Sequence, residues 1–161
     1  MRTPFVGAAG TALTVILNNL GILRSRVYLT NVVHCNKLDE QGKLMTPDEE
    51  DIGKCLTHLQ CEIRMVQPKL IIALGNPAMH ALTYDYTKKI GVEHGKVMDL
   101  HPDFNVPAKV ICTYHPSWMI RQKGDDFEKA KTLIWNDLWQ AAQLAKSLAP
   151  DYDYQKRPLF I

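Results

Sequence analysis

Apolar positions along the chain alternate between helical spacing and short continuous runs. Leucine and isoleucine recur every three or four residues after Gly10, whereas Val27-Tyr-Leu-Thr-Asn-Val-Val33 is a β-rich run typical of a buried strand. Both patterns return further along the chain. They predict helices from Gly10 to Leu20, from Pro47 to the residue before Pro68, from Pro77 through Leu82 and from about Asp125 to Leu148, and strands over 27–33, 70–74 and 109–114.

Polar and glycine-containing segments separate these elements. Residues 35–45 are predicted to form a loop that ends at Thr46-Pro-Asp-Glu49, where Thr46 would cap the next helix and Pro47 would occupy its first position. Residues 84–107 have weak periodicity, so short strands and loops are expected there. The chain of 161 residues has the length of one domain, which we place over residues 1–149, with a C-terminal tail over residues 150–161.

Helices and strands in alternation predict an α/β fold. We expect a three-layer sandwich, in which helices flank both faces of a central parallel sheet. In such sheets, functional residues gather at the carboxyl ends of the strands. That rule selects Asn31 and Cys35 after the first strand, Gly75-Asn76-Pro77 after the second, and His115-Pro-Ser117 after the third.

Charge and composition narrow the classes of partner. Nineteen Lys and Arg against 17 Asp and Glu give a net charge of +2, too near balance for a histone-like arm. Any binding to nucleic acid must therefore use a local patch. The sequence has no long apolar run and no secretory signal pattern, and it contains four cysteines. We expect a reducing, cytoplasmic setting and no membrane partner.

The turn after the third predicted strand carries the strongest candidate chemistry. His115 lies at the rim of the sheet, and Ser117 and Arg121 beside it are suited to holding a phosphate. Trp118 and Met119 with Ile120 form an apolar tip that is costly to expose unless it inserts into something, such as a base stack. The alternatives are a surface loop histidine and apolar side chains that pack on the core.

Two further side chains could contact a flat polar ligand. The carboxamide of Asn31 can donate and accept at once along a base edge, and the alternative is a strand-end cap. Phe5 lies in a glycine-rich entry to a helix, where its ring could stack on a substrate or belong to the core.

Five short motifs occur in a fixed order. They are Pro4-Phe-Val-Gly-x-Ala-Gly10, Tyr28-Leu-Thr-Asn31-Val-Val-x-Cys35, Glu49-Glu50 before Cys55, Pro68-Lys-x-Ile-Ile-Ala-Leu-Gly75-x-x-Ala78 and Thr113-Tyr-His115-Pro-Ser117-x-x-x-Arg121. In this order the chain resembles the uracil-DNA glycosylase superfamily, in particular its iron-sulfur family-four enzymes and the related domains of some phage DNA polymerases. The resemblance covers about residues 3–140.

The resemblance implies roles in binding and excising uracil. Phe5, beside Gly7, would stack on the extruded base, and Asn31 would pair with the uracil edge and reject cytosine. His115 would hydrogen-bond the uracil O2 while negative charge develops there, which lowers the barrier to cleavage of the N-glycosidic bond.

The resemblance also implies contacts with DNA, single- or double-stranded, that contains uracil. Ser117 and the backbone at Gly75 and Asn76 would hold flanking phosphates, partly through a helix N-terminus. Trp118, Met119 and Arg121 match the family's intercalation loop, which would help the base to leave the stack.

A metal cluster is implied only in part. Cys35 and Cys55 match two of the four thiolate ligands of a 4Fe-4S cluster. A Cys, Cys, His site for zinc that includes His58 is an alternative, and a pair of cysteines that has lost its partners ranks above it.

The N-terminal part departs from the family. Its members begin with Cys-x-x-Cys and a strand ending in a Gly-Glu-x-Pro-Gly type loop, and neither motif occurs here. The first strand is therefore expected to be missing. Three explanations are open: the chain is a fragment or begins at the wrong codon, a second chain completes it, or the fold has been reused for binding. The two functional hypotheses are a uracil-DNA glycosylase of base excision repair in a bacterial or phage-infected cell, and a catalytically impaired adaptor that binds DNA or a DNA polymerase.

Overall fold

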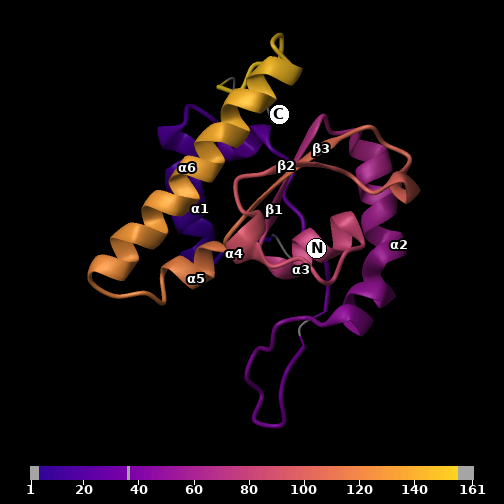
Figure 1. Ribbon diagram of the computed structural model, residues 1–161, viewed down its shortest axis with the longest axis vertical. Helices are drawn as coiled ribbons and strands as arrows, with labels where there is room; N and C mark the ends of the chain where they lie inside the picture. The colour runs from indigo at the N-terminus through magenta and orange to yellow at the C-terminus, as the bar shows by residue number, and fades with distance from the viewer. Residues whose placement is uncertain (1–3, 36, 156–161) are drawn as a thin grey trace, which may run out of the picture.

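The computed structural model of the chain describes residues 4–35 and 37–155. Figure 1 shows a small central sheet between helices. The elements in chain order are α1 (Ala8–Asn19), the 3-10 helix η1 (Arg24–Arg26), α2 (Glu49–Val66), β1 (Leu70–Leu74), α3 (Asn76–Thr83), α4 (Ile90–Glu93), β2 (Val97–Asp99), the 3-10 helix η2 (Pro102–Phe104), β3 (Lys109–Thr113), α5 (Pro116–Met119) and α6 (Asp125–Leu148).

The sheet has the order β1-β3-β2 and is mixed. β1 and β3 are parallel, with Leu70 opposite Lys109 and Leu74 opposite Thr113, whereas β2 runs antiparallel to β3. The α/β class with helices on both faces is confirmed. The expected parallel pairing is present between β1 and β3, and β2 adds an antiparallel strand, because the short connection through η2 returns the chain to the neighbouring strand in the opposite direction.

The predicted strand over residues 27–33 does not form. Among the described residues, β1 pairs only with β3, and the segment 27–33 is extended but belongs to no ladder. Apolar side chains of this segment still pack against the rest of the protein. Leu29 packs with the helices on one side of the sheet, and Val32 packs with those on the other side. The run of apolar residues thus records burial of side chains rather than pairing of the backbone.

Two apolar clusters lie on opposite faces of the sheet. In Figure 1, α2 lies on one side of the sheet and α1 with α6 on the other. Side chains alternate along β1, so that Ala73 enters one cluster while Ile72 and Leu74 contact the other. The α2–α3 core consists of Ile52, Leu59, Ile63, Ala73, Met79, Ala81, Leu82, Leu100, Phe104, Val106, Ala108, Val110 and Cys112. The α1–α6 core consists of Leu13, Ile16, Leu17, Leu20, Ile22, Met119, Ala130, Ile134, Leu138 and Ala142.

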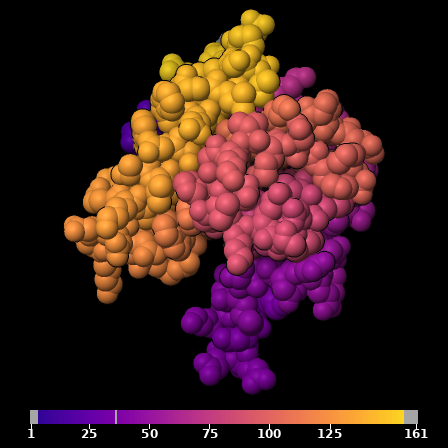
Figure 2. Space-filling model, viewed as in Figure 1, coloured from indigo at the N-terminus to yellow at the C-terminus, as the bar shows by residue number. Residues whose placement is uncertain are grey.

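The predicted loop before α2 projects from the body of the protein. Figures 1 and 2 show it as a separate purple lobe, and Leu38 and Leu44 form an isolated bridge across it. The sequence predicted Thr46 as the cap of the helix that follows, but the structure shows Asp48 in that position. Asp48 accepts the Asp51 N–H at 3.1 Å, and the Asp51 carboxylate accepts the Asp48 N–H at 3.0 Å. This reciprocal pair satisfies two donors that Thr46 lies too early to reach.

The residues after α6 pack back on the domain. The Leu23 N–H donates to the Tyr154 carbonyl at 3.0 Å, and the Tyr154 hydroxyl donates to the Ala145 carbonyl at 2.8 Å. The apolar end Leu159-Phe-Ile161 lies outside the described residues. Among the helices of the described ranges, none combines the length and the apolar character that a membrane crossing requires.

Candidate active site

His115 is held by the turn that it begins. It follows β3 and caps α5, and its Nδ1 accepts the Ser117 N–H at 3.1 Å while lying 2.7 Å from Ser117 Oγ. Pro116 in the first helical position fixes the turn. Because Nδ1 acts as an acceptor, the neutral ring carries its proton on Nε2, which has no partner within the described residues.

The surroundings of His115 favour that neutral ring. Burial lowers the pKa of His115, and the nearby positive charge of Arg121 lowers it further. At neutral pH the side chain is thus an uncharged N–H donor, fixed in one tautomer, at the carboxyl end of β3.

Phe5 lies against His115. The two rings are stacked with centroids 5.6 Å apart and an angle of 22° between their planes. Phe5 adopts the left-handed backbone conformation (φ 58°), and its carbonyl occupies the space that a side chain at position 10 would need. A Cβ at Gly10 would lie 1.7 Å from that carbonyl oxygen. Arg24 secures the turn from the other side, donating to the Pro4 carbonyl at 2.7 Å.

Gly7 and Asn31 lie at the surface. Gly7 is the N-cap residue of α1 in an extended conformation, with nothing within 4 Å of the position of a Cβ. Asn31 is exposed on the extended segment 27–33, and its amide has no hydrogen-bond partner within residues 4–35 and 37–155. Both are accessible to a ligand.

The ends of β1 and β3 meet at one edge of the sheet. The Gly75 N–H donates to the Thr113 carbonyl at 2.8 Å, and a Cβ at Gly75 would lie 3.3 Å from the His115 Cβ. Asn76 opens α3, and its side chain accepts the Ile90 N–H at 2.8 Å. The side chain of Asn76 is therefore engaged within the protein, whereas the Gly75–Asn76 backbone lies close to His115.

The apolar turn after His115 divides between core and surface. Met119 is 4% exposed and belongs to the α1–α6 core, so in this conformation it follows the core-packing alternative. Trp118 is half-buried, its ring stacked on Tyr114 with centroids 4.2 Å apart. Ile120 is 41% exposed, and Arg121 is exposed beside it. Ile120 and Arg121 are therefore the side chains that this turn presents to solvent.

A buried polar network beneath the site went unpredicted. Asp137 of α6, 5% exposed, accepts the Thr113 hydroxyl at 2.6 Å and pairs with His94 Nδ1 at 3.1 Å. The ring of Tyr114 lies between His94 and Trp118. A signal was available in the sequence, because Asp137 is an acidic residue on the apolar face of the last predicted helix.

The cysteines of the described residues do not form a complete ligand set for a 4Fe-4S cluster. Cys35 and Cys61 are exposed and Cys55 is half-buried, whereas Cys112 lies inside β3, where burial and then the charge of Glu93 raise its pKa to about 12. Such a cluster needs four thiolates. In residues 4–35 and 37–155, no cysteine belongs to a group of three or more metal-ligating side chains with ligand atoms within 4.8 Å.

Comparison with known proteins identifies the family of the chain. The family profile described as the uracil DNA glycosylase superfamily matches residues 1–139. The chain is 35% identical over 139 residues to the Type-4 uracil-DNA glycosylase of Thermotoga maritima, covering 81% of this chain and 68% of that protein.

Two archaeal relatives with the same name give similar values. Identity is 36% over 131 residues with the protein of Pyrobaculum aerophilum, and 37% over 143 residues with that of Sulfurisphaera tokodaii. The alignments cover 78% and 81% of this chain, and 64% and 61% of those relatives. The chain thus spans about two thirds of the length of the relatives it matches. With the profile match over most of its residues, it belongs to the uracil DNA glycosylase superfamily.

Proposed function

We propose that this chain is a DNA glycosylase that removes uracil from DNA by hydrolysis of the N-glycosidic bond. Membership of the superfamily and the names of its relatives support this activity. The observation that carries it for this chain is the fixed tautomer of His115, whose Nδ1 accepts the Ser117 N–H and leaves Nε2–H to donate.

The proposed reaction depends on where charge develops. As the bond from the sugar to N1 of uracil breaks, the sugar gains positive character and the base leaves as an anion. Water adds to C1′ of the sugar, and the proton that it releases neutralises the uracil anion. His115 Nε2–H donates to the O2 oxygen of the departing base, so the anion gains a hydrogen bond that grows stronger toward the transition state. Because His115 is already oriented by Ser117, no reorganisation accompanies that step.

Substrate recognition is assigned to Phe5, Gly7 and Asn31. Phe5 stacks on the flipped base, with the chain at Gly7 close to it. The amide of Asn31 pairs with the uracil edge, whose donor and acceptor are exchanged in cytosine. Its exposure and its lack of an internal partner in the described part of the chain support this role.

The grip on DNA is assigned to the turn around α5 and to the start of α3. Ser117 and the Gly75–Asn76 backbone hold phosphates, and Arg121 adds a charged contact. Trp118 and Met119 support the turn from below, and the exposed Ile120 is its apolar tip. A single-stranded substrate is expected to react more readily than a duplex, because base flipping then requires no unpairing.

Two histidines allow a matched test. His101 precedes Pro102 and accepts the Asp103 N–H through Nδ1, as His115 does with Ser117. Incubation with a uracil-containing single-stranded oligonucleotide is expected to produce abasic sites. His115→Ala lowers the rate about 100- to 1000-fold, the usual cost of losing one donor to a developing anion, and His101→Ala leaves it unchanged.

Two outcomes contradict the excision reading. Wild-type protein that yields no abasic sites, or His115→Ala that cleaves at the wild-type rate, excludes it. Salt-dependent binding to the oligonucleotide without cleavage supports the alternative, an adaptor that keeps the fold and binds DNA or a DNA polymerase.

Two finer assignments belong to the same proposal. A second chain can add a strand beside β1, whose only described partner is β3 and whose Ile71 and Ile72 are partly exposed.

Cys35 and Cys55 supply two ligands of an iron-sulfur cluster. Because the described residues supply no complete set, protein purified without oxygen is expected to contain less than one cluster per chain by iron analysis and visible absorption. We place the activity in the cytoplasm of a bacterial or phage-infected cell.

A further inference from the structure

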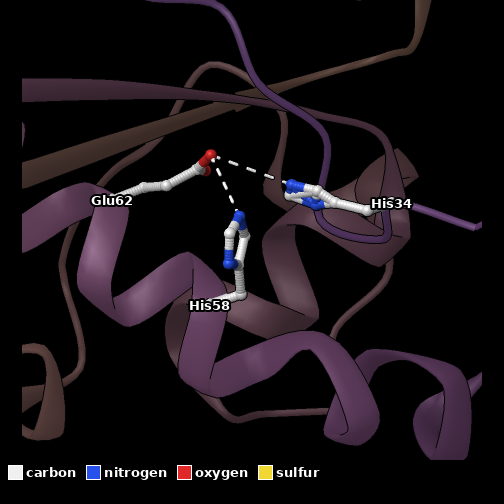
Figure 3. A group of neighbouring side chains, drawn as sticks. All are labelled: His34, His58 and Glu62. Carbon is white, nitrogen blue, oxygen red and sulfur yellow. Dashed lines mark ion pairs between the residues drawn. The ribbon is translucent and has the colours of Figure 1, made fainter. Parts of the chain in front are cut away.

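Three metal-ligating side chains that take no part in the proposed excision of uracil converge beside α2. Figure 3 shows His34, His58 and Glu62 pointing toward one another. Their ligand atoms all lie within 4.8 Å of one another. His58 and Glu62 are one turn apart on α2, and His34 comes from the extended segment that precedes the projecting loop.

The spacing of the three ligand atoms is close to that of a metal site. Glu62 Oε1 lies 3.5 Å from His58 Nε2 and 3.8 Å from His34 Nε2. Two ligand atoms at about 2.1 Å from a tetrahedral ion lie about 3.4 Å apart. The two imidazole rings meet edge to face, with centroids 4.3 Å apart. Small side-chain rotations therefore suffice to close the three groups around one ion.

The carboxylate is already oriented for this task. Thr30 donates its hydroxyl to Glu62 Oε2 at 2.7 Å, and Tyr28 donates to Oε1 at 3.3 Å, so the Oε1 edge faces the histidines. Burial, followed by the charge of Glu62, raises the pKa of Tyr28 and keeps its hydroxyl a donor. Hydrogen bonds of this kind behind a ligand fix its direction and strengthen metal binding.

We propose that His34, His58 and Glu62 bind one divalent transition-metal ion, with Zn²⁺ as the best match. Two imidazoles and one carboxylate suit zinc and its neighbours, whereas magnesium and calcium favour oxygen ligands. The Glu62 side chain is 13% exposed, but those of His34 and His58 are 37% and 63% exposed, so water can complete the coordination from the solvent side.

A bound ion would fasten the extended segment to α2. Residues 27–33 belong to no strand ladder among the described residues, and Tyr28, Thr30 and His34 all meet α2 at Glu62. The ion would therefore hold Asn31, which lies between these contacts, in a fixed place. Binding to the folded chain alone raises the melting temperature, by about 5–10 °C at a zinc concentration 100 times the dissociation constant.

The test uses the full chain stripped with a chelator and titrated with Zn²⁺ in a calorimeter, without DNA. One ion per chain is expected, with a rise in melting temperature. His58→Ala and Glu62→Gln each weaken binding about 10- to 100-fold or more. His101→Ala and the double variant Cys35→Ser, Cys55→Ser keep the wild-type affinity. His58 is largely exposed, so its removal leaves the fold intact, as circular dichroism should verify.

Several results would overturn the assignment. The first is that Zn²⁺ shows no saturable binding, and the second is that wild type and His58→Ala bind it with equal affinity. The third is that the double cysteine variant loses binding while His58→Ala keeps it, which would make the thiolates the ligands. Because the measurement uses no uracil and no DNA, its result tests the zinc site independently of the proposed excision of uracil.

Discussion

The position of one proton determines what His115 can do. The turn His115-Pro-Ser117 places the Ser117 N–H on Nδ1 and leaves the other ring nitrogen as a donor. This arrangement could be predicted from local sequence, because the capping histidine, the proline and the serine are consecutive residues. What local sequence omits is the burial of the ring and the stacking of Phe5 on it, which join residues 110 positions apart along the chain.

The depressed pKa of His115 gives a pH dependence with a definite sign. The proposed donor is the neutral ring, and both burial and Arg121 lower the pKa. The rate of excision at saturating DNA should therefore stay constant from about pH 8 to about pH 6.5, the ordinary histidine value, and fall only at lower pH. Arg121→Gln removes one of the two causes, so its acidic limb should lie at higher pH.

Single-turnover rates between pH 4.5 and pH 8 test this expectation. Lys123→Gln, two residues further along the same turn, is the control and should keep the wild-type profile. Identical acidic limbs in wild type and Arg121→Gln would show that Arg121 does not influence His115.

Two glycines at the start of α1 differ sharply in the room around them. Gly10→Ala places a methyl group 1.7 Å from the Phe5 carbonyl oxygen, a clash with backbone that no rotamer relieves. We expect it to lower the free energy of unfolding by about 1–3 kcal/mol. Gly7→Ala meets nothing within 4 Å and should cost under about 1 kcal/mol, since alanine caps a helix less well than glycine. Urea unfolding of the two variants compares them directly, and equal losses would contradict the close contact.

Strands and helices were predictable to different degrees. The helical period identifies α1, α2, α3 and α6, because one apolar face repeats over several turns. The run over residues 27–33 is rich in residues that favour strands, as β1 is, yet of the two only β1 has a partner backbone among the described residues. An apolar run indicates that side chains are buried, but it does not predict which strand pairs with that segment. The direction of β2 was likewise fixed by its connection rather than by its residues.

One buried carboxylate of α6 adds a polar contact to the apolar packing of this helix on the sheet. Asp137→Ala leaves the hydroxyl of Thr113, which is fully buried, and the ring of His94 without their acceptor. Each unsatisfied buried group costs about 1–3 kcal/mol, so a large loss of stability in urea unfolding is expected. Asp126→Ala, exposed in the first turn of α6, should remain close to wild type. Equal stabilities of the two variants would mean that the network contributes nothing.

The protein as a whole carries little net charge for the DNA-binding role that we propose. A net charge of +2 favours a short contact with phosphates over a long electrostatic track. The motifs were enough to select the turn that we propose to contact DNA. The cluster beside α2 could not be found from the order of motifs, because His58 and Glu62 lie 24 and 28 residues after His34 in the sequence.

Salt dependence measures that contact. The logarithm of the affinity for a single strand should fall with the logarithm of salt concentration, with a slope that decreases by about 0.7 when Arg121→Gln removes one phosphate contact. Lys54→Gln is the control, because Lys54 is paired with Glu50 on α2. Fluorescence anisotropy at several salt concentrations gives both slopes. An unchanged slope for Arg121→Gln would place the phosphate contact elsewhere.

The two cores differ in the stretch of chain that they require. The buried members of the α2–α3 core all come from residues 52–112, a continuous segment, whereas those of the α1–α6 core come from residues 13–22 and residues 119–142. On the ribosome, the first can assemble as soon as β3 has emerged, while α1 must wait for α6. Until then the apolar face of α1 is uncovered. Because chaperones bind exposed apolar surface, we expect α1 to be a chaperone-binding segment of the nascent chain.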